Sequence, residues 1–349
     1  MPAPSRRTVL KSIGLLGLSG IAASQPVARA LLDERDNLPP FPPRWRGQPY
    51  GRIAGPVQPA RAAPTTEAEE LKQLRQDDVV PVWRVVRGER VFPNNDWWLE
   101  TKHGYLYASL VQPMWNHGPN APVENLGGGR WAWLTVPFSD GFRHPDPDEE
   151  DGFVSRLRYG GVIRVAALET GEDGQAWYRA RELYQSFYVR AAHVRLIPDE
   201  ALTPLSPEVD PRDKRIEVNL SEQTLVAFEG EKAVFAHQVS SGVPEYATPD
   251  GVHYVLDKRI SERMVGGIDE YKYNLPGVPF VCYFTWDWAG THGCYWHNDW
   301  GRQRSHGCLN LPPDAARWLW RWTTPHADLD EMVVRPQHKL DGTKIIVRY

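Results

Sequence analysis

Glycine and proline constrain this chain more than any other feature, because they account for 29 and 31 of its 349 residues. Glycine permits turns with positive φ, and proline fixes φ and interrupts helices and central strands. This density predicts many turns and short elements, and therefore a mainly β fold. The composition is otherwise ordinary for a globular protein, with 41% apolar and 24% charged residues, which excludes a largely disordered chain. A chain of this length has room for two or three domains.

Residues 1–30 have the layout of an export signal. Arg6 and Arg7 precede an apolar run from Ser12 to Ser24, and an Ala-Arg-Ala cleavage pattern follows at 28–30. The segment resembles a bacterial twin-arginine signal peptide, whose arginines are bound by a receptor. The alternative is a short membrane anchor, but the apolar run is too short to cross about 30 Å of hydrocarbon. We therefore expect export to the periplasm, the cell wall or the extracellular space.

The charge argues against nucleic acid as a partner. The formal net charge is -4, and removal of residues 1–30 takes away four cations and no acid, which leaves -8. Nucleic-acid-binding domains usually carry a basic excess or a basic patch. We predict no nucleic-acid partner, and the sequence gives no indication of the oligomeric state.

Two segments have the composition of linkers. Residues 31–64 are rich in proline and show little periodicity, which predicts a semi-extended linker. Residues 199–213 combine prolines and acids, also without periodicity, and predict a second linker.

Between these linkers one sequence pattern occurs twice. In each copy a strand-like run is followed by a strand that starts with Trp, a turn, and an aromatic strand that ends in Ala-x-x-Val. The two copies lie at 79–111 and at 162–194. The spacing of about 80 residues fits a duplicated small domain. The pattern resembles bacterial SH3-like barrels, modules often attached to cell-wall enzymes, so we predict SH3-like modules at residues 65–118 and 130–198. The resemblance implies cell-wall binding through these modules.

The chain beyond residue 213 alternates between strands and turns. Residues 216–220 have the period of two expected of a half-buried strand. Residues 224–228 and 233–239 flank Glu229-Gly230-Glu231 and predict a hairpin. Residues 278–285 and 289–293 flank another turn at 286–288. The best helix signal is residues 313–320, which begin with Pro and Asp.

Histidines and cysteines concentrate in residues 291–310. A nucleophilic cysteine needs a base and needs donors for the oxyanion that forms when it attacks a carbonyl. His292 and Cys308 can supply the base and the thiol if their segments lie side by side. Gly307 permits close approach of the backbone, and a helix that starts near Pro313 would lower the pKa of Cys308.

These residues resemble the signature of the YkuD-type L,D-transpeptidases. The motif Ser305-His306-Gly307-Cys308-Leu309-Asn310 follows His292-Gly293, and residues 216–220 and 248–251 are supporting matches. The resemblance covers residues 214–349 and implies a YkuD-like mixed β catalytic domain after the two SH3-like barrels. It also implies an exported enzyme that forms 3→3 cross-links in peptidoglycan.

The resemblance implies a role for each matched residue. Cys308 is the nucleophile, His292 is its general base and later acid, and the Gly293 carbonyl orients the imidazole. The N–H groups of His306, Gly307 and Cys308 form the oxyanion hole, while Ser305, His306 and Asn310 shape the loop. The partner is a peptidoglycan stem peptide, and no cofactor is implied. Four residues are expected in the substrate pocket by proximity alone: Tyr283, Trp296, His297 and Asn298.

Several alternatives stay open. The same site could act as an L,D-carboxypeptidase, with water as the acceptor, or the chain could be a non-catalytic wall-binding protein. His292, His297, His306, Cys294 and Cys308 could together bind zinc, but glycines after His292 and His306 favour a catalytic turn, so we predict no metal.

A second hypothesis concerns the other two cysteines. This chain has Cys294 where the family is expected to carry Thr or Ser. Cys282 and Cys294 are equidistant from the turn at Trp288. We therefore consider a Cys282–Cys294 disulfide, with two buried free thiols as the alternative.

Overall fold

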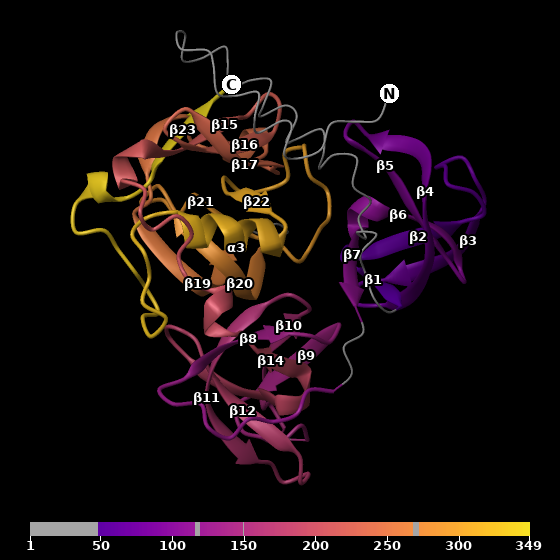
Figure 1. Cartoon of the computed structure of the whole chain (residues 1–349). Helices are drawn as coiled ribbons and strands as arrows, with labels where there is room; N and C mark the ends of the chain where they lie inside the picture. Colours follow the sequence, from indigo (N-terminus) through magenta and orange to yellow (C-terminus); the bar gives the residue numbers. More distant parts are fainter. Residues whose placement is uncertain (1–47, 116–118, 149, 268–271) are drawn as a thin grey trace, which may run out of the picture.

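The computed structural model describes residues 48–115, 119–148, 150–267 and 272–349. These residues form three units built mainly of strands (Figure 1), which confirms the mainly β fold class. The expected signal peptide at 1–30 lies outside the described residues, as does the predicted linker up to residue 47.

The first module, residues 49–115, is a sheet of strand order β3-β2-β6-β5-β4-β1-β7. Its apolar core is formed by buried residues that include Ile53, Leu99, Leu106 and Val111. Its elements are β1 (Pro49–Ile53), β2 (Val57–Arg61), β3 (Glu70–Arg75), β4 (Val79–Phe92), β5 (Asn95–Thr101), β6 (Gly104–Tyr107), the 3-10 helix η1 (Ala108–Leu110) and β7 (Val111–Trp115).

The linker predicted over 31–64 is wrong for its second half, because β1 and β2 lie within it. Pro49 stands at the first position of β1, where a missing N–H is tolerated, and Pro56 precedes β2. β1 pairs with β4 and β7, which are distant in sequence. These partners give the segment a strand conformation that its own periodicity does not indicate.

The second module, residues 130–196, repeats the architecture of the first. Its strand order, β10-β9-β13-β12-β11-β8-β14, matches that of the first module strand for strand, and each module has a 3-10 helix before its last strand. The structure therefore contains a duplicated unit. Its elements are β8 (Arg130–Leu134), β9 (Phe138–Phe142), β10 (Phe153–Arg158), β11 (Val162–Thr170), β12 (Ala176–Arg181), β13 (Ser186–Arg190), η2 (Ala191–His193) and β14 (Val194–Leu196).

Two sheets form the C-terminal domain. One has the order β17-β16-β15-β23-β18 and the other β19-β20-β21-β22. The connection at 199–213 and the domain contain η3 (Asp199–Ala201), η4 (Pro211–Asp213), β15 (Lys214–Asn219), β16 (Thr224–Glu229), β17 (Lys232–Gln238), η5 (Pro244–Tyr246), β18 (Gly251–Tyr254), β19 (Asp257–Gly266), β20 (Tyr273–Tyr283), β21 (Gly290–Gly293), β22 (Leu309–Leu311), α3 (Pro313–Trp322), η7 (Lys339–Asp341) and β23 (Lys344–Arg348).

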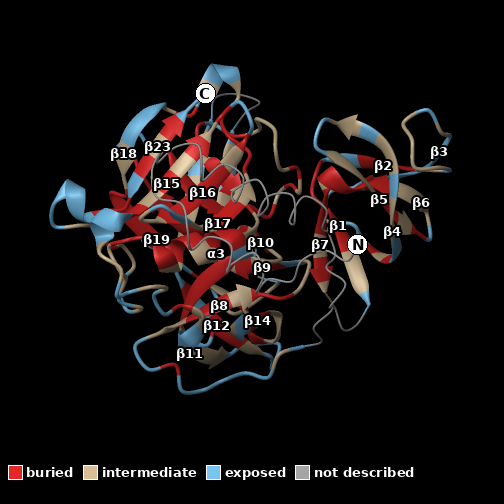
Figure 2. Cartoon of the chain, turned by 45° about the horizontal axis from the view of Figure 1, so that its top comes forward, coloured by how far each residue is buried: buried red, intermediate tan, exposed pale blue. Residues whose placement is uncertain are grey.

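Helix α3 lies in the core of this domain. Its buried face, which includes Ala316, Leu319 and Trp322, belongs to one apolar cluster with residues of both sheets, and α3 packs on β20 and β21 (Figures 1 and 2). The stacked rings of Trp318 and Trp322 lie on one side of the helix. The predicted helix at 313–320 and the predicted hairpin at 224–239 are both confirmed.

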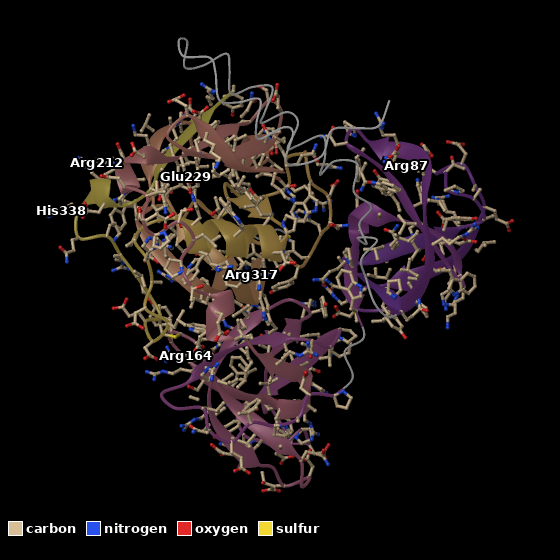
Figure 3. All side chains as sticks on the ribbon, in the orientation of Figure 1. Arg87, Arg164, Arg212, Glu229, Arg317 and His338 are labelled. Carbon is tan, nitrogen blue, oxygen red and sulfur yellow. The ribbon has the colours of Figure 1, made fainter. Side chains whose placement is uncertain are left out.

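The second module shares this core. Trp131 and Val162 belong to the same apolar cluster as α3, and Trp133 packs against Phe280 of β20. The Trp131 indole also donates to the Leu329 carbonyl (2.8 Å). Figure 3 marks Arg164, which binds Asp330 across this boundary. The 199–213 connection adds buried Leu202 to the cluster, so this segment is not a free linker.

The first module is attached mainly through polar contacts. The buried guanidinium of Arg52 in β1 donates to Gln112 and Asp77 of its own module and to the Tyr295 carbonyl of the C-terminal domain (2.6 Å). Asp77 is also bound by Arg158 of the second module. Arg52 and Asp77 therefore form a junction at which all three units meet.

Within the described ranges, no helix combines the length and the apolarity needed to cross a membrane.

Replacement of Trp131 by Ala tests the shared core. We expect a loss of about 3–5 kcal/mol in the free energy of unfolding, because a large aromatic side chain leaves a cavity in a packed core. Calorimetry should show the second module and the C-terminal domain unfolding in one transition that shifts as a unit. Trp83→Ala, at a side chain that is 60% exposed, should change the stability by less than about 0.5 kcal/mol. Two separate transitions, only one of them shifted, would contradict the shared core.

Candidate active site

Strand pairing brings the two halves of the sequence motif together. β21 and β22 run parallel and pair Thr291 with Leu309 and His292 with Asn310. Cys308 directly precedes β22, and its sulfur accepts a hydrogen bond from the backbone of Gly290 at the start of β21. The predicted base and the predicted nucleophile therefore lie on adjoining segments, as the sequence analysis required.

His292 is a buried, neutral imidazole with a defined tautomer. Its Nδ1 lies 3.1 Å from the Gly293 carbonyl, and since a carbonyl only accepts, Nδ1 carries the proton and Nε2 is the basic nitrogen. Burial lowers the pKa of His292 to about 4. The hydrogen bond to Gly293 raises the pKa, but by less than burial lowers it. The Trp296 ring lies 5.7 Å from the imidazole, centroid to centroid. The Gly293 carbonyl thus contacts the ring nitrogen that the predicted orienting role requires.

Cys308 is the cysteine that reaches the surface, whereas Cys282 and Cys294 are buried. Its thiol donates to the Trp288 carbonyl (3.5 Å). Desolvation of the sulfur raises the pKa of Cys308 to about 11, although the Gly290 hydrogen bond opposes the rise. The effect expected from α3, which begins five positions later, does not decide this pKa, because desolvation is the largest influence on it. At rest the thiol and the imidazole are therefore both neutral.

The loop from Ser305 to Cys308 is a fixed turn. Ser305 Oγ donates to the Cys308 carbonyl (2.5 Å) and accepts from the Gly307 N–H (3.2 Å). Gly307 has a φ of +109°, which a side chain would strain. Of the N–H groups predicted for the oxyanion hole, that of Gly307 is therefore already engaged, and those of His306 and Cys308 remain as candidates.

The remaining predicted residues occupy different surroundings. His306 is exposed, with its ring centroid 4.5 Å from that of Tyr246 and 5.3 Å from that of Tyr273. Tyr283 is buried at the end of β20, with its ring against Trp288. Asn310 is buried, with its amide 3.1 Å from His297 Nε2.

Two of the predicted pocket residues face the interior or the first module instead. His297 is buried, Asp299 N–H donates to its Nδ1, and its Nε2 contacts Asn310. Both nitrogens are thus engaged by protein, so its assignment to the pocket is wrong. Asn298 accepts from the Trp300 indole, and its backbone N–H donates to the Ser109 carbonyl of the first module. Closeness in sequence did not reveal that Trp296 lies near the His292 ring, whereas His297 and Asn298 have other partners.

The turn between β20 and β21 contributes residues that the sequence analysis did not assign. Trp286 and Trp288 are 70% and 53% exposed, and Trp288 has a left-handed φ of +66°, which is unusual for a bulky residue. The Trp288 ring packs against Tyr283 and lies 5.2 Å from the guanidinium carbon of Arg259. In the sequence, the occurrence of two tryptophans within one tight turn was the signal that could have identified these residues.

The hypothesis of a Cys282–Cys294 disulfide is wrong in this structure, since all three cysteines are free. The hairpin register pairs Cys282 with Thr291, and Cys294 lies beyond the end of β21, where its N–H donates to Leu311. The Cys282 sulfur contacts Thr323 Oγ1, whereas the Cys294 sulfur faces the His297 carbonyl. Equal distance from the turn therefore did not place the two thiols opposite each other.

Metal binding was the other alternative for these residues. In the part of the chain that the structure describes, no three or more His, Cys, Asp or Glu side chains are grouped so that they could hold a metal ion.

Comparisons with known proteins find one matching family. Residues 213–347 match the YkuD family, described as the L,D-transpeptidase catalytic domain. A cysteine-to-serine mutant of the Enterococcus faecium L,D-transpeptidase is 26% identical over 39% of this chain and 50% of its own length, with a TM-score of 0.32. The match thus spans about half of that protein. The solution structure of the E. faecium catalytic domain is also 26% identical, over 39% of this chain and 98% of its own, with a TM-score of 0.31.

L,D-transpeptidase 3 of Mycobacterium tuberculosis is 17% identical over 54% of this chain and 92% of its own, with a TM-score of 0.32. No curated protein matches the chain by sequence.

Alkylation tests the assignment of the thiols. In the folded protein iodoacetamide should modify Cys308 alone, at a rate that rises with pH toward about 11, because the pKa of Cys308 is raised by burial. After unfolding without reductant, Cys282 and Cys294 should also react. Peptide-level mass spectrometry counts the modified thiols, and a single modified thiol in the unfolded, non-reduced protein would show that the disulfide exists.

The pH dependence of stability tests the burial of His292. Its pKa is about 4 in the folded protein and about 6.5 when unfolded, so unfolding takes up a proton between these values. Stability is therefore retained above pH 6.5 and falls by about 3 kcal/mol as the pH drops to 4. Urea denaturation of His292→Asn should show a pH dependence smaller by this amount. His338→Asn, at an exposed histidine, should retain the wild-type dependence, and equal profiles for all three proteins would argue against a buried neutral His292.

Proposed function

We propose that this protein is an exported L,D-transpeptidase that cross-links peptidoglycan through Cys308, since residues 213–347 match the family model of the L,D-transpeptidase catalytic domain. The observation that carries the proposal is the parallel pairing of β21 with β22, which places the Cys308 thiol beside the strand of His292.

The first half-reaction is acylation of Cys308. His292 Nε2 takes the thiol proton as the sulfur attacks the carbonyl between the third residue and the terminal D-Ala of a tetrapeptide stem. The proton transfer accompanies the attack, because thiol and imidazole are both neutral at rest. The oxyanion is stabilised by backbone N–H groups of the 306–308 turn. The C–N bond then breaks, His292 returns the proton to the leaving amine, and D-Ala departs.

The second half-reaction transfers the acyl group to an amine. The side-chain amine of a diamino acid on a neighbouring stem attacks the thioester carbonyl and loses a proton to His292. The C–S bond breaks, and the proton returns to the Cys308 sulfur. The Gly293 carbonyl keeps Nδ1 protonated throughout, so Nε2 remains the nitrogen that exchanges the proton.

The proposal extends to the two duplicated modules and to export. The modules are SH3-like units that bind the cell wall, and residues 1–30 act as a twin-arginine signal. The duplicated topology supports the first assignment, and the paired arginines before an apolar run support the second.

Covalent labelling by a carbapenem tests the nucleophile. The E. faecium catalytic domain is known acylated by ertapenem. We expect intact-mass measurement to show one ertapenem adduct on wild type and none on Cys308→Ala. His292→Ala should acylate about 10²–10⁴-fold more slowly, the contribution of a positioned general base. If wild type gains no mass, the chain is a wall-binding protein without this chemistry.

Product analysis separates the transferase from the hydrolase. With purified tetrapeptide muropeptides a transpeptidase yields 3→3 dimers, and an L,D-carboxypeptidase yields trimmed tripeptides. Trimmed monomers alone, from a protein that ertapenem acylates, would replace the transpeptidase assignment with the carboxypeptidase one.

A further inference from the structure

The segment that connects the base to the nucleophile is held by the first module. We define the connecting segment as residues 294–304, between β21 and the Ser305–Cys308 turn. Arg52 donates to the Tyr295 carbonyl (2.6 Å), and the Ser109 carbonyl accepts from Asn298 N–H (2.9 Å). Asn94 Nδ2 donates to the Gly301 carbonyl (2.6 Å). These contacts run along the length of the segment.

Asp299 is the centre of this attachment. Its side chain is buried, and its carboxylate accepts from Ser109 Oγ (3.1 Å) and from Arg304 (2.9 Å), with Arg302 at 3.4 Å. Asn95 Nδ2 donates to Ser109 Oγ, which leaves the hydroxyl proton available for the carboxylate. A buried carboxylate requires such donors, because a charge taken out of water is costly unless it is hydrogen-bonded.

From Asp299 the contacts continue to the base. Asp299 N–H donates to His297 Nδ1 (3.2 Å), and His297 Nε2 lies 3.1 Å from the Asn310 amide. Asn310 pairs across the parallel strands with His292. The Asp299 carbonyl also accepts from Ser240 Oγ, and the backbone of Ser240 pairs with that of Asn310. A continuous set of hydrogen bonds thus joins Ser109 to the strand next to His292.

The duplicated unit has other residues at the positions of Ser109, Asp77 and Arg52. Ser109 in η1 corresponds to Ala192 in η2, since each is the second residue of the 3-10 helix before the last strand. Asp77 and Gly160 occupy the same left-handed turn, with φ of +69° and +78°. Arg52 pairs with the first residue of β4, and Trp133 with the first residue of β11. In all three cases the first module carries the polar residue and uses it outside its own fold.

We propose that the first module positions the active site of the C-terminal domain through Ser109 and Asp299, which hold the connecting segment and thereby the relative placement of His292 and Cys308. The inference rests on the proposed acyl-transfer function and assigns the module a task besides wall binding. Ser109 and Asp299 are positioning residues, since they act through His297 and Asn310.

Ser109→Ala tests this with a variant that should fold, because Ala occupies the equivalent position in the second module. The control is Thr65→Val, which removes a hydroxyl that also donates to a carboxylate, that of Glu89 (2.8 Å), but within the first module. We expect ertapenem to acylate full-length Ser109→Ala about tenfold more slowly than wild type, the scale of a hydrogen bond to a charged group. Thr65→Val should stay within about twofold of wild type.

A second measurement separates repositioning from simple destabilisation. If the connecting segment shifts, the Cys308 thiol becomes more exposed to water. The pH at which iodoacetamide alkylates it at half the maximal rate should then move from about 11 toward the ordinary pKa of a thiol. Equal melting temperatures for Ser109→Ala and Thr65→Val, with only the former changed in both assays, would support the proposal.

The two proposals fail differently. If Ser109→Ala is acylated and alkylated in the same way as wild type, the positioning role is overturned. The proposed acyl-transfer function is not affected by that result. If wild type does not take up ertapenem, the function fails, and the alkylation midpoint alone then decides whether Ser109 positions Cys308. An unchanged midpoint rejects the inference, and a lowered midpoint supports it.

Discussion

The arrangement of the three units depends on the burial of one cation, the Arg52 guanidinium. Burial lowers the pKa of Arg52 to about 10, so the group remains charged at neutral pH and must be satisfied where it lies. Its acceptors are the Gln112 amide, the Asp77 carboxylate and the Tyr295 carbonyl. Removal of Asp77 would leave the buried charge without its anionic partner, which is far costlier than a lost surface contact. The first module therefore has one placement on the C-terminal domain in which this charge is satisfied.

The two modules meet this domain by different physical means. The second contributes Trp131 and Val162 to the common core, an attachment that depends on buried apolar area. The first uses directional hydrogen bonds, which specify position rather than only proximity. Loops that connect strands belong to the less stable parts of a protein. The connecting segment is such a loop, and the directional contacts with the first module hold it in place.

Structural elements that depend on neighbouring residues were predicted from the sequence, whereas contacts between residues far apart in the chain were not. The turns, the 224–239 hairpin and α3 follow from residue types within a few positions of one another. The linker error has the opposite origin, since β1 becomes a strand only by pairing with β4 and β7. His292 and Cys308 were paired through their resemblance to a family, and the physical cause, a parallel ladder between β21 and β22, is invisible in their spacing. Arg52, Asp77 and Tyr295 are too far apart in the chain for any pattern to connect them. Cys294 was misplaced because the hairpin register pairs Cys282 with Thr291, not with Cys294.

The Trp288 carbonyl connects the Cys308 thiol to a turn at the protein surface. The residue that accepts the hydrogen bond of the thiol lies in a surface turn and has a left-handed backbone conformation. A glycine there would relax the backbone but would remove the ring contacts with the buried Tyr283 and with Arg259. A substitution in that turn would thus change the surroundings of the Cys308 thiol. Through this carbonyl, a change at the protein surface reaches the thiol by way of the backbone alone.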